Sequence, residues 1–163
     1  MSRPFLAAAS AMLLLSAFPG GAMGQTAPER GVDVASEAQA AASVVDAFHA
    51  ALEAGETEAA LALMAEDAMV FEEGGAERSR AEYASHHLQA DAAYAAASES
   101  SMARRVGRTS GDLAWIMSEG HTVGQAGNSA TARLTVETMV LAREPDGWRI
   151  RHIHWSSRAA PAA

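Results

Sequence analysis

The hydrophobic pattern of this chain changes its period once, near residue 97. Before that point apolar residues recur at three- and four-residue spacing, as at Val44, Val45, Phe48 and Leu52. After it, apolar and polar residues alternate, as they do in strands that cover a core with one face. Helices followed by a run of antiparallel strands predict an α+β fold. We expect a cone-shaped half-barrel, in which a curved antiparallel sheet wraps around three N-terminal helices and encloses a cavity.

The helical part divides at turn residues. The pattern predicts helices over 34–54, 57–67 and 80–97, with a short strand at 69–71 between the last two. Ser79 and Glu82 form a capping box before the third helix. The alternating part predicts strands, separated by glycine-containing turns, over 101–106, 113–118, 130–143 and 148–157.

The first 24 residues are predicted to be a secretory signal peptide. An uncharged apolar run of 14 residues, 5–18, follows Arg3, and it is shorter than the roughly 20 residues that span a bilayer. Small residues at 22 and 24 suit cleavage after Gly24. An uncleaved anchor is the alternative. The remaining chain divides into a flexible lead-in at 25–33, one domain at 34–158 and a tail at 159–163.

Composition limits the partners and the chemistry. The chain has 20 acidic against 12 basic side chains, for a formal net charge of −8, so a nucleic-acid partner is not expected. It has no cysteine, which removes disulfides and thiol catalysis. The leader predicts a periplasmic or secreted protein that has no membrane segment after cleavage.

The order of elements resembles a known superfamily. FHAALEAGE at 48–56, AAL at 59–61 and AEDA at 65–68 resemble the opening of nuclear-transport-factor-two-like proteins. GWRIRHIHWSS at 147–157 resembles the final strand of the SnoaL-like and ketosteroid-isomerase-like branches, and also the association domain of calmodulin-dependent kinase. The resemblance implies a cystatin-like cone with a small-molecule pocket between sheet and helices. It also implies frequent homodimers through the sheet, and isomerase, cyclase, dehydratase or association roles.

The strongest local feature is the pair His152 and His154. Alternation on a strand places both imidazoles on one face, about 6.5–7 Å apart. Trp148 lies on the same face by this count and has the character of a core residue, so the pair is expected to face the cavity. Glu137 lies in an apolar strand and could form an acid–base pair with a strand histidine. The alternatives are histidines bonded to neighbouring strands and a glutamate on the exposed face.

Further candidates for the pocket lie on the third helix and the second long strand. His87 and Asp91 are four residues apart on one helix face, with Tyr83 one turn earlier. Trp115 and Glu119 are in register with each other on one strand. An exposed helix face with a solvated His–Asp pair is the alternative for the first group.

Three functions remain open from the residues alone. The first is a small-molecule pocket that binds or transfers protons, with isomerase, lyase or hydrolase-type acid–base chemistry at His152, His154 and Glu137. The second is a zinc or copper site at His87, His152 and His154. The third is a dimeric interaction module without catalysis, which would expose an apolar outer sheet face.

Overall fold

The computed structural model describes residues 31–126 and 129–161. The predicted signal peptide, the lead-in up to residue 30 and two residues of the predicted 124–128 loop lie outside these ranges. Within the described residues, none of the helices has the length and apolar content needed to cross a bilayer.

Seven strands form one curved, unclosed sheet in the order β1-β4-β5-β6-β7-β2-β3. The sheet is mainly antiparallel, but β1 runs parallel to β4 and β2 runs parallel to β7. The strands are β1 (Gly31–Val34), β2 (Met64–Glu72), β3 (Gly75–Glu77), β4 (Glu99–Ser110), β5 (Leu113–Ala126), β6 (Ser129–Glu144) and β7 (Gly147–Ala159).

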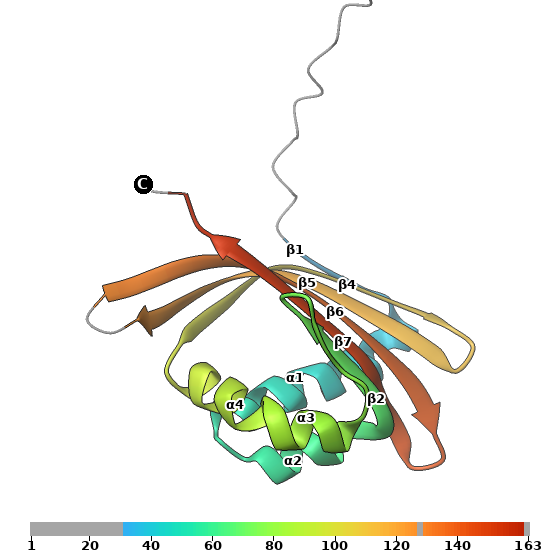
Figure 1. Cartoon of the computed structure of the whole chain (residues 1–163). Coiled ribbons are helices and arrows are strands. Elements are labelled where there is room, and N and C mark those ends of the chain that lie inside the picture. The colour runs from blue at the N-terminus through green and yellow to red at the C-terminus, as the bar shows by residue number, and fades with distance from the viewer. Residues whose placement is uncertain (1–30, 127–128, 162–163) are drawn as a thin grey trace, which may run out of the picture.

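The helices lie together on one face of this sheet, and the other face is open (Figure 1). They are α1 (Gln39–Glu53), α2 (Thr57–Ala62), α3 (Arg80–His86) and α4 (Leu88–Ala96), with a short 3-10 helix η1 (Ser36–Ala38) before α1. The α+β expectation is therefore confirmed. We call the side toward the helices the inner face and the opposite side the outer face.

The first expected helix begins five residues late. Gly31–Val34 forms the edge strand β1 instead, because it pairs with β4. Gly107 makes this pairing possible, since a Cβ at that position would lie 2.9 Å from Cγ1 of Val34. Pairing with a distant strand has overridden the local pattern here, and the last residues of the predicted lead-in belong to the sheet.

The second and third expected helices also differ from the prediction. Residues 64–67, predicted to be helical, begin strand β2. The expected third helix bends at His87, which separates α3 from α4. Hydrogen bonds from His87 N to Tyr83 O and from Asp91 N to His87 O continue the helical pattern through the bend. These two bonds join α3 to α4 through His87.

The core lies between the inner face and α1. One complete row of aligned inner residues is apolar: Gly107, Ile116, Met139, Ile153 and Val70. Apart from the glycine, which has no side chain, each of these residues has a fully buried side chain. Helix α1 covers this region with Val45, Phe48 and Leu52. The predicted apolar stripe of the first helix is therefore the one that packs on the sheet.

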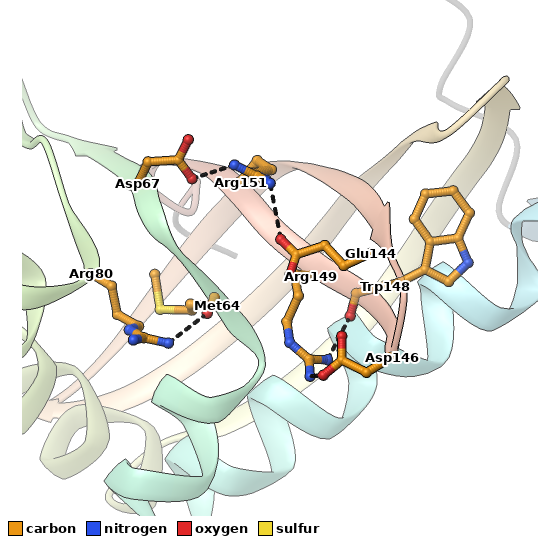
Figure 2. Close-up of polar contacts among 8 residues, drawn as sticks. All are labelled: Met64, Asp67, Arg80, Glu144, Asp146, Trp148, Arg149 and Arg151. Atoms are coloured by element: carbon orange, nitrogen blue, oxygen red, sulfur yellow. Dashed lines mark hydrogen bonds and ion pairs between the residues drawn. The ribbon is translucent and has the colours of Figure 1, made fainter.

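Strand β7 contains one extra residue, Arg151. Leu141 of β6 pairs with Ile150, but its neighbour Val140 pairs with His152. This β-bulge reverses the alternation of side chains along the rest of the strand. Figure 2 shows Arg151 between carboxylates from the two flanking strands. It forms an ion pair with Asp67 of β2 and another, at 2.9 Å, with Glu144 of β6.

Burial on the inner face predicts that the same substitution, valine to alanine, has very different effects on stability at two positions. Val70 is 1% exposed in the core row and Val32 of β1 is 64% exposed. Val70→Ala removes two buried methyl groups and leaves a cavity, so it should lower the free energy of unfolding by about 2 kcal/mol or more. Val32→Ala should change it by less than about 0.5 kcal/mol. Urea unfolding of both variants measures this, and equal losses would contradict the assigned faces.

Candidate functional site

The inner face becomes polar one row beyond the apolar core row. The aligned residues in this row come from five adjacent strands: Arg105, Ser118, Glu137, Trp155 and Glu72. Burying such side chains has a free-energy cost unless each finds a partner. A polar row between a sheet and its covering helices therefore marks a candidate site.

Glu137 is the centre of this row. Its residue is 9% exposed, and its carboxylate is held from three sides. His49 of α1 places Nε2 2.7 Å from Oε2, and Trp155 donates its indole N–H to the same oxygen at 2.8 Å. Ser118 donates a longer hydrogen bond, 3.4 Å, to Oε1. Of the two placements that the sequence left open for Glu137, the structure has the inward one, and its histidine partner comes from a helix rather than from a strand.

The two partners change each other's acidity in opposite directions. Burial by itself raises the pKa of Glu137. The hydrogen bond and charge of His49, together with the Trp155 hydrogen bond and the charge of Arg105, outweigh it and lower this pKa overall. Burial likewise lowers the pKa of His49, but Glu137 outweighs it and raises the net value. The pair is therefore held as imidazolium and carboxylate over a wider pH range than the isolated groups.

His49 is the member of the pair that solvent can reach. Its side chain is 36% exposed, whereas that of Glu137 is 8% exposed. The neighbouring Phe48 stacks on Trp155 with ring centroids 6.3 Å apart, which fixes α1 against β7. This arrangement resembles a general base whose orientation is set by a buried carboxylate.

Arg105 closes the other end of the charged network. Its Nε donates to Ser118 Oγ at 3.1 Å, and its guanidinium forms an ion pair with Asp46 of α1. Arg105 is buried, whereas Asp46 is largely exposed. The network therefore contains two cationic and two anionic side chains, and its charges balance when His49 is protonated.

A second polar cluster lies on the far side of Trp155. Tyr83 donates its hydroxyl proton to Asp91 Oδ2 at 2.9 Å, and His87 Nδ1 contacts the buried carboxylate of Glu77. The bend at His87 brings these groups together. Glu72, which is aligned with Trp155, completes the cluster. The predicted association of Tyr83, His87 and Asp91 is seen, but their neighbours are acids of β2 and β3.

The carboxyl groups of Glu72 and Asp91 in this second cluster have pKa values above those of ordinary carboxyl groups. Burial, followed by the charge of Asp91, raises the pKa of Glu72. Burial also raises the pKa of Asp91, although the hydrogen bond from Tyr83 partly opposes it. Burial and Asp91 raise the pKa of Tyr83, so its phenol stays protonated. The carboxyls on the two sides of Trp155 are therefore shifted in opposite directions.

The structure places His152 and His154 on the outer face, so the expectation that they face the cavity is wrong. The bulge at Arg151 reverses the alternation, and Ile153 and Trp155 face inward instead. Both imidazoles contact the ring of Phe71, and neither is within the Glu137 network. The acid–base pairing of these histidines with Glu137 is therefore replaced by that of His49.

Three other expected pocket residues lie elsewhere. Trp115 and Glu119 lie on the outer face of β5, because the alternate residues Ala114, Ile116 and Ser118 face inward. Glu119 forms an ion pair there with Arg104. Trp148 is buried in the core before the bulge, beneath the guanidinium of Arg143.

The proposed metal ligands are not brought together. His87 lies with Glu77 on the helix side, whereas His152 and His154 lie on the opposite face of the sheet. In the described ranges, no three His, Asp or Glu side chains gather so that they could hold an ion. The expected zinc or copper site at these three histidines is therefore wrong.

Two shallow hollows mark the described surface. One of about 460 Å³ lies beside Arg151 and is bordered by Arg80 and Arg149; the other, of about 300 Å³, lies beside Phe71 and Gly75. Neither hollow is lined by His49 or Glu137. Solvent reaches the charged pair through His49, whose side chain is partly exposed.

His49 was missed by sequence reasoning, although one feature points to it. It lies four residues after buried Val45 and directly after buried Phe48, so it borders the apolar stripe of α1. A polar residue at the edge of a core stripe can reach a partner on the sheet. Nothing in the sequence shows that this partner is Glu137.

Comparison with protein families adds an independent observation. Residues 41–161 match the model of the SnoaL-like domain. The chain belongs to the SnoaL-like family. The match spans α1 to β7, and so it contains both clusters. This places the chain in the nuclear-transport-factor-two-like superfamily, as the sequence resemblance implied. A comparison with curated proteins found no match.

Solved structures show the same fold. A proposed ketosteroid isomerase from Shewanella frigidimarina is 37% identical, with a TM-score of 0.66 over 72% of this chain and 94% of that one. A proposed dehydratase from Streptomyces avermitilis is 22% identical, with a TM-score of 0.63 over 76% and 97% of the two chains. The S. rosetta CaMKII hub is 19% identical, with a TM-score of 0.64 over 76% and 98%. The last two show the fold alone.

The charged pair of this SnoaL-like protein should stabilise it within a bounded pH window. The pKa of Glu137 is lowered, so its contribution is present above 4.5 and is lost as the pH falls through the folded value. The pKa of His49 is raised, so its contribution is complete below 6.5 and is lost as the pH rises through the folded value.

A double-mutant cycle of His49→Gln and Glu137→Gln, read by urea unfolding, measures this contribution. At pH 5.5 we expect a coupling in the lower part of the range of about 0.5–3 kcal/mol, because His49 is partly solvated. At pH 8.5 it should be smaller. The exposed pair Arg133 and Glu73, 3.7 Å apart, is the control and should show almost none. A coupling unchanged between the two pH values would contradict the assignment.

Proposed function

We propose that this protein catalyses proton transfer on a small organic molecule bound at the polar row. One observation carries the proposal. Carboxyl groups on the two sides of Trp155 have pKa values displaced in opposite directions, lowered for Glu137 and raised for Glu72 and Asp91. Such a separation keeps Glu137 ionised beside His49, the base of the pair, while Glu72 or Asp91 keeps a proton that it can donate.

The roles of the groups follow from their exposure. Above its raised pKa the His49 ring is neutral and is the proton acceptor that a ligand can touch, and Glu137 orients the ring and stabilises the imidazolium that forms. Glu72 and Asp91 are the proton donors, because their raised pKa values keep one of them protonated to higher pH. Trp155 lies between the two groups and offers an apolar surface to a flat ligand.

The reaction type is the removal of a proton beside a carbonyl by His49. In an isomerisation a proton is returned at another carbon; in a dehydration the donor carboxyl protonates a departing hydroxyl group, which leaves as water while the C=C bond forms. The Shewanella relative described as a proposed ketosteroid isomerase supports this class of chemistry. Binding without turnover is the alternative for the same site. The predicted leader at 1–24 supports a further proposal, that the protein acts in the periplasm or outside the cell.

Exchange of carbon-bound hydrogen tests the proposal without a known substrate. The protein is incubated in deuterium oxide with a panel of small ketones and enones, and loss of the proton beside each carbonyl is followed by NMR. We expect faster exchange for at least one compound. His49→Gln and Glu137→Gln should each lower that rate by about 100-fold, as removal of a general base does.

The control is His86→Gln, an exposed histidine of α3, which should exchange as the wild type does. Equal rates in wild type and His49→Gln would contradict the assigned base, and equal rates in wild type and Glu137→Gln would contradict the orienting role of Glu137. Saturable binding by a panel member, read by tryptophan fluorescence, without any exchange would favour a binding protein over an enzyme.

A second function, a homodimer through the sheet, is favoured by the outer face. That face exposes large apolar side chains from three strands, among them Met69, Phe71, Met117 and Val136. Exposed apolar patches of this kind mark interaction sites. We infer that two copies pair through this face, and a monomer at about 100 µM and neutral pH would contradict it. The two functions are compatible, because they use opposite faces of the sheet.

A further inference from the structure

Two aligned rows of the outer face run through the histidines of β7. The first row contains Val106, Met117, Thr138, His154 and Phe71, and the second contains Arg108, Trp115, Val140, His152 and Met69. The histidines are thus the polar part of a surface that is otherwise mostly apolar. Because this is the face inferred to pair two copies, both imidazoles would enter the contact.

The two imidazoles form one compact group with Phe71. Its ring meets His152 edge-on at 4.9 Å and His154 at 6.5 Å between centroids, and the imidazoles are 6.4 Å apart. His152 Nδ1 lies 3.2 Å from the carbonyl oxygen of Met69. Protonation of both rings would therefore place two positive charges next to each other on an apolar surface.

The groups that face this pair offer little compensation for that charge. The flanking side chains are Met69 and Phe71 on β2, Val140 and Thr138 on β6, and beyond them Trp115 and Met117 on β5. Neither row contains a carboxylate.

The nearest charged groups around these rows are already engaged. Arg151, just before His152, is paired with Asp67 and Glu144. Arg108 is paired with Asp33, and Glu119 in the adjoining row is paired with Arg104, its aligned neighbour on β4. Glu73, in the turn after β2, lies 3.7 Å from Arg133.

We propose that His152 and His154 make the pairing of two copies pH-dependent, so that the dimer forms with neutral imidazoles and dissociates when they gain protons. The proposal rests on the inferred homodimer. Covering a charged imidazolium with an apolar surface is unfavourable, and a two-fold contact brings four imidazoles together.

The direction of this effect opposes the general electrostatics of the chain. The formal net charge is −8 at pH 7, so acidification lowers the overall repulsion between two copies and would by itself favour association. Dissociation on acidification would therefore require a specific positive group within the contact.

Sedimentation velocity of the purified protein at pH 7.5 and pH 5.5, at equal ionic strength, tests the proposal. If one proton is taken up on dissociation, the dissociation constant of the dimer rises about tenfold for each unit by which the pH falls. We expect the dimer to be at least tenfold weaker at pH 5.5. The double variant His152→Gln, His154→Gln should dimerise equally at both pH values. The control His86→Gln, on the helix side of the molecule, should keep the wild-type response.

Each outcome separates the pH effect from the dimer itself. A monomer at both pH values would overturn the pairing and the proposal together. A dimer of equal strength at both pH values, weakened by Met117→Glu, would keep the pairing and overturn the role of the histidines. A pH response that persists in the double glutamine variant would also overturn that role. Circular dichroism at pH 5.5 checks that each variant is folded.

Discussion

The extra residue in β7, Arg151, determines which side chains reach the interior. Without it, strict alternation from Trp148 would turn His152 and His154 toward the helices. With it, Ile153 enters the apolar core row and Trp155 reaches Glu137, while both histidines lie on the open face. The bulge is held by ion pairs to both neighbouring strands. The candidate site and the candidate interface therefore both depend on one bulged residue.

Burial gives the inner polar row its chemical character. Glu137 remains charged inside the protein because three donors, from α1, β5 and β7, converge on it. Glu72 and Asp91 lie close together with less compensation, so burial and mutual repulsion keep protons on them. The fold thus holds a carboxyl group with a lowered pKa and carboxyl groups with raised pKa values on opposite sides of strand β7. That separation links the sheet register to the proposed proton transfer.

Periodicity predicted much of this structure. The change of period near residue 97 predicted the α+β class, the capping box at Ser79 predicted the start of α3, and the spacing of Tyr83, His87 and Asp91 predicted their association. Other features depend on contacts distant in sequence. The pairing of β1 with β4 replaced a helical start, and α1 supplied the partner of Glu137. The bulge had the largest effect, because counting in twos across Arg151 reversed every later assignment on β7.

The charge state of His49 tests this account most directly. Nitrogen-15 NMR titration of the imidazoles should show His49 with a pKa above 6.5, as expected for a ring paired with a buried carboxylate. In Glu137→Gln the pKa of His49 should fall below that value, because burial and the charge of Arg105 then lower it and only the charge of Glu53 opposes them. If Glu137→Gln moved His152 or His154 and left His49 as it was, the assigned faces of β7 and the proposed site would both be wrong.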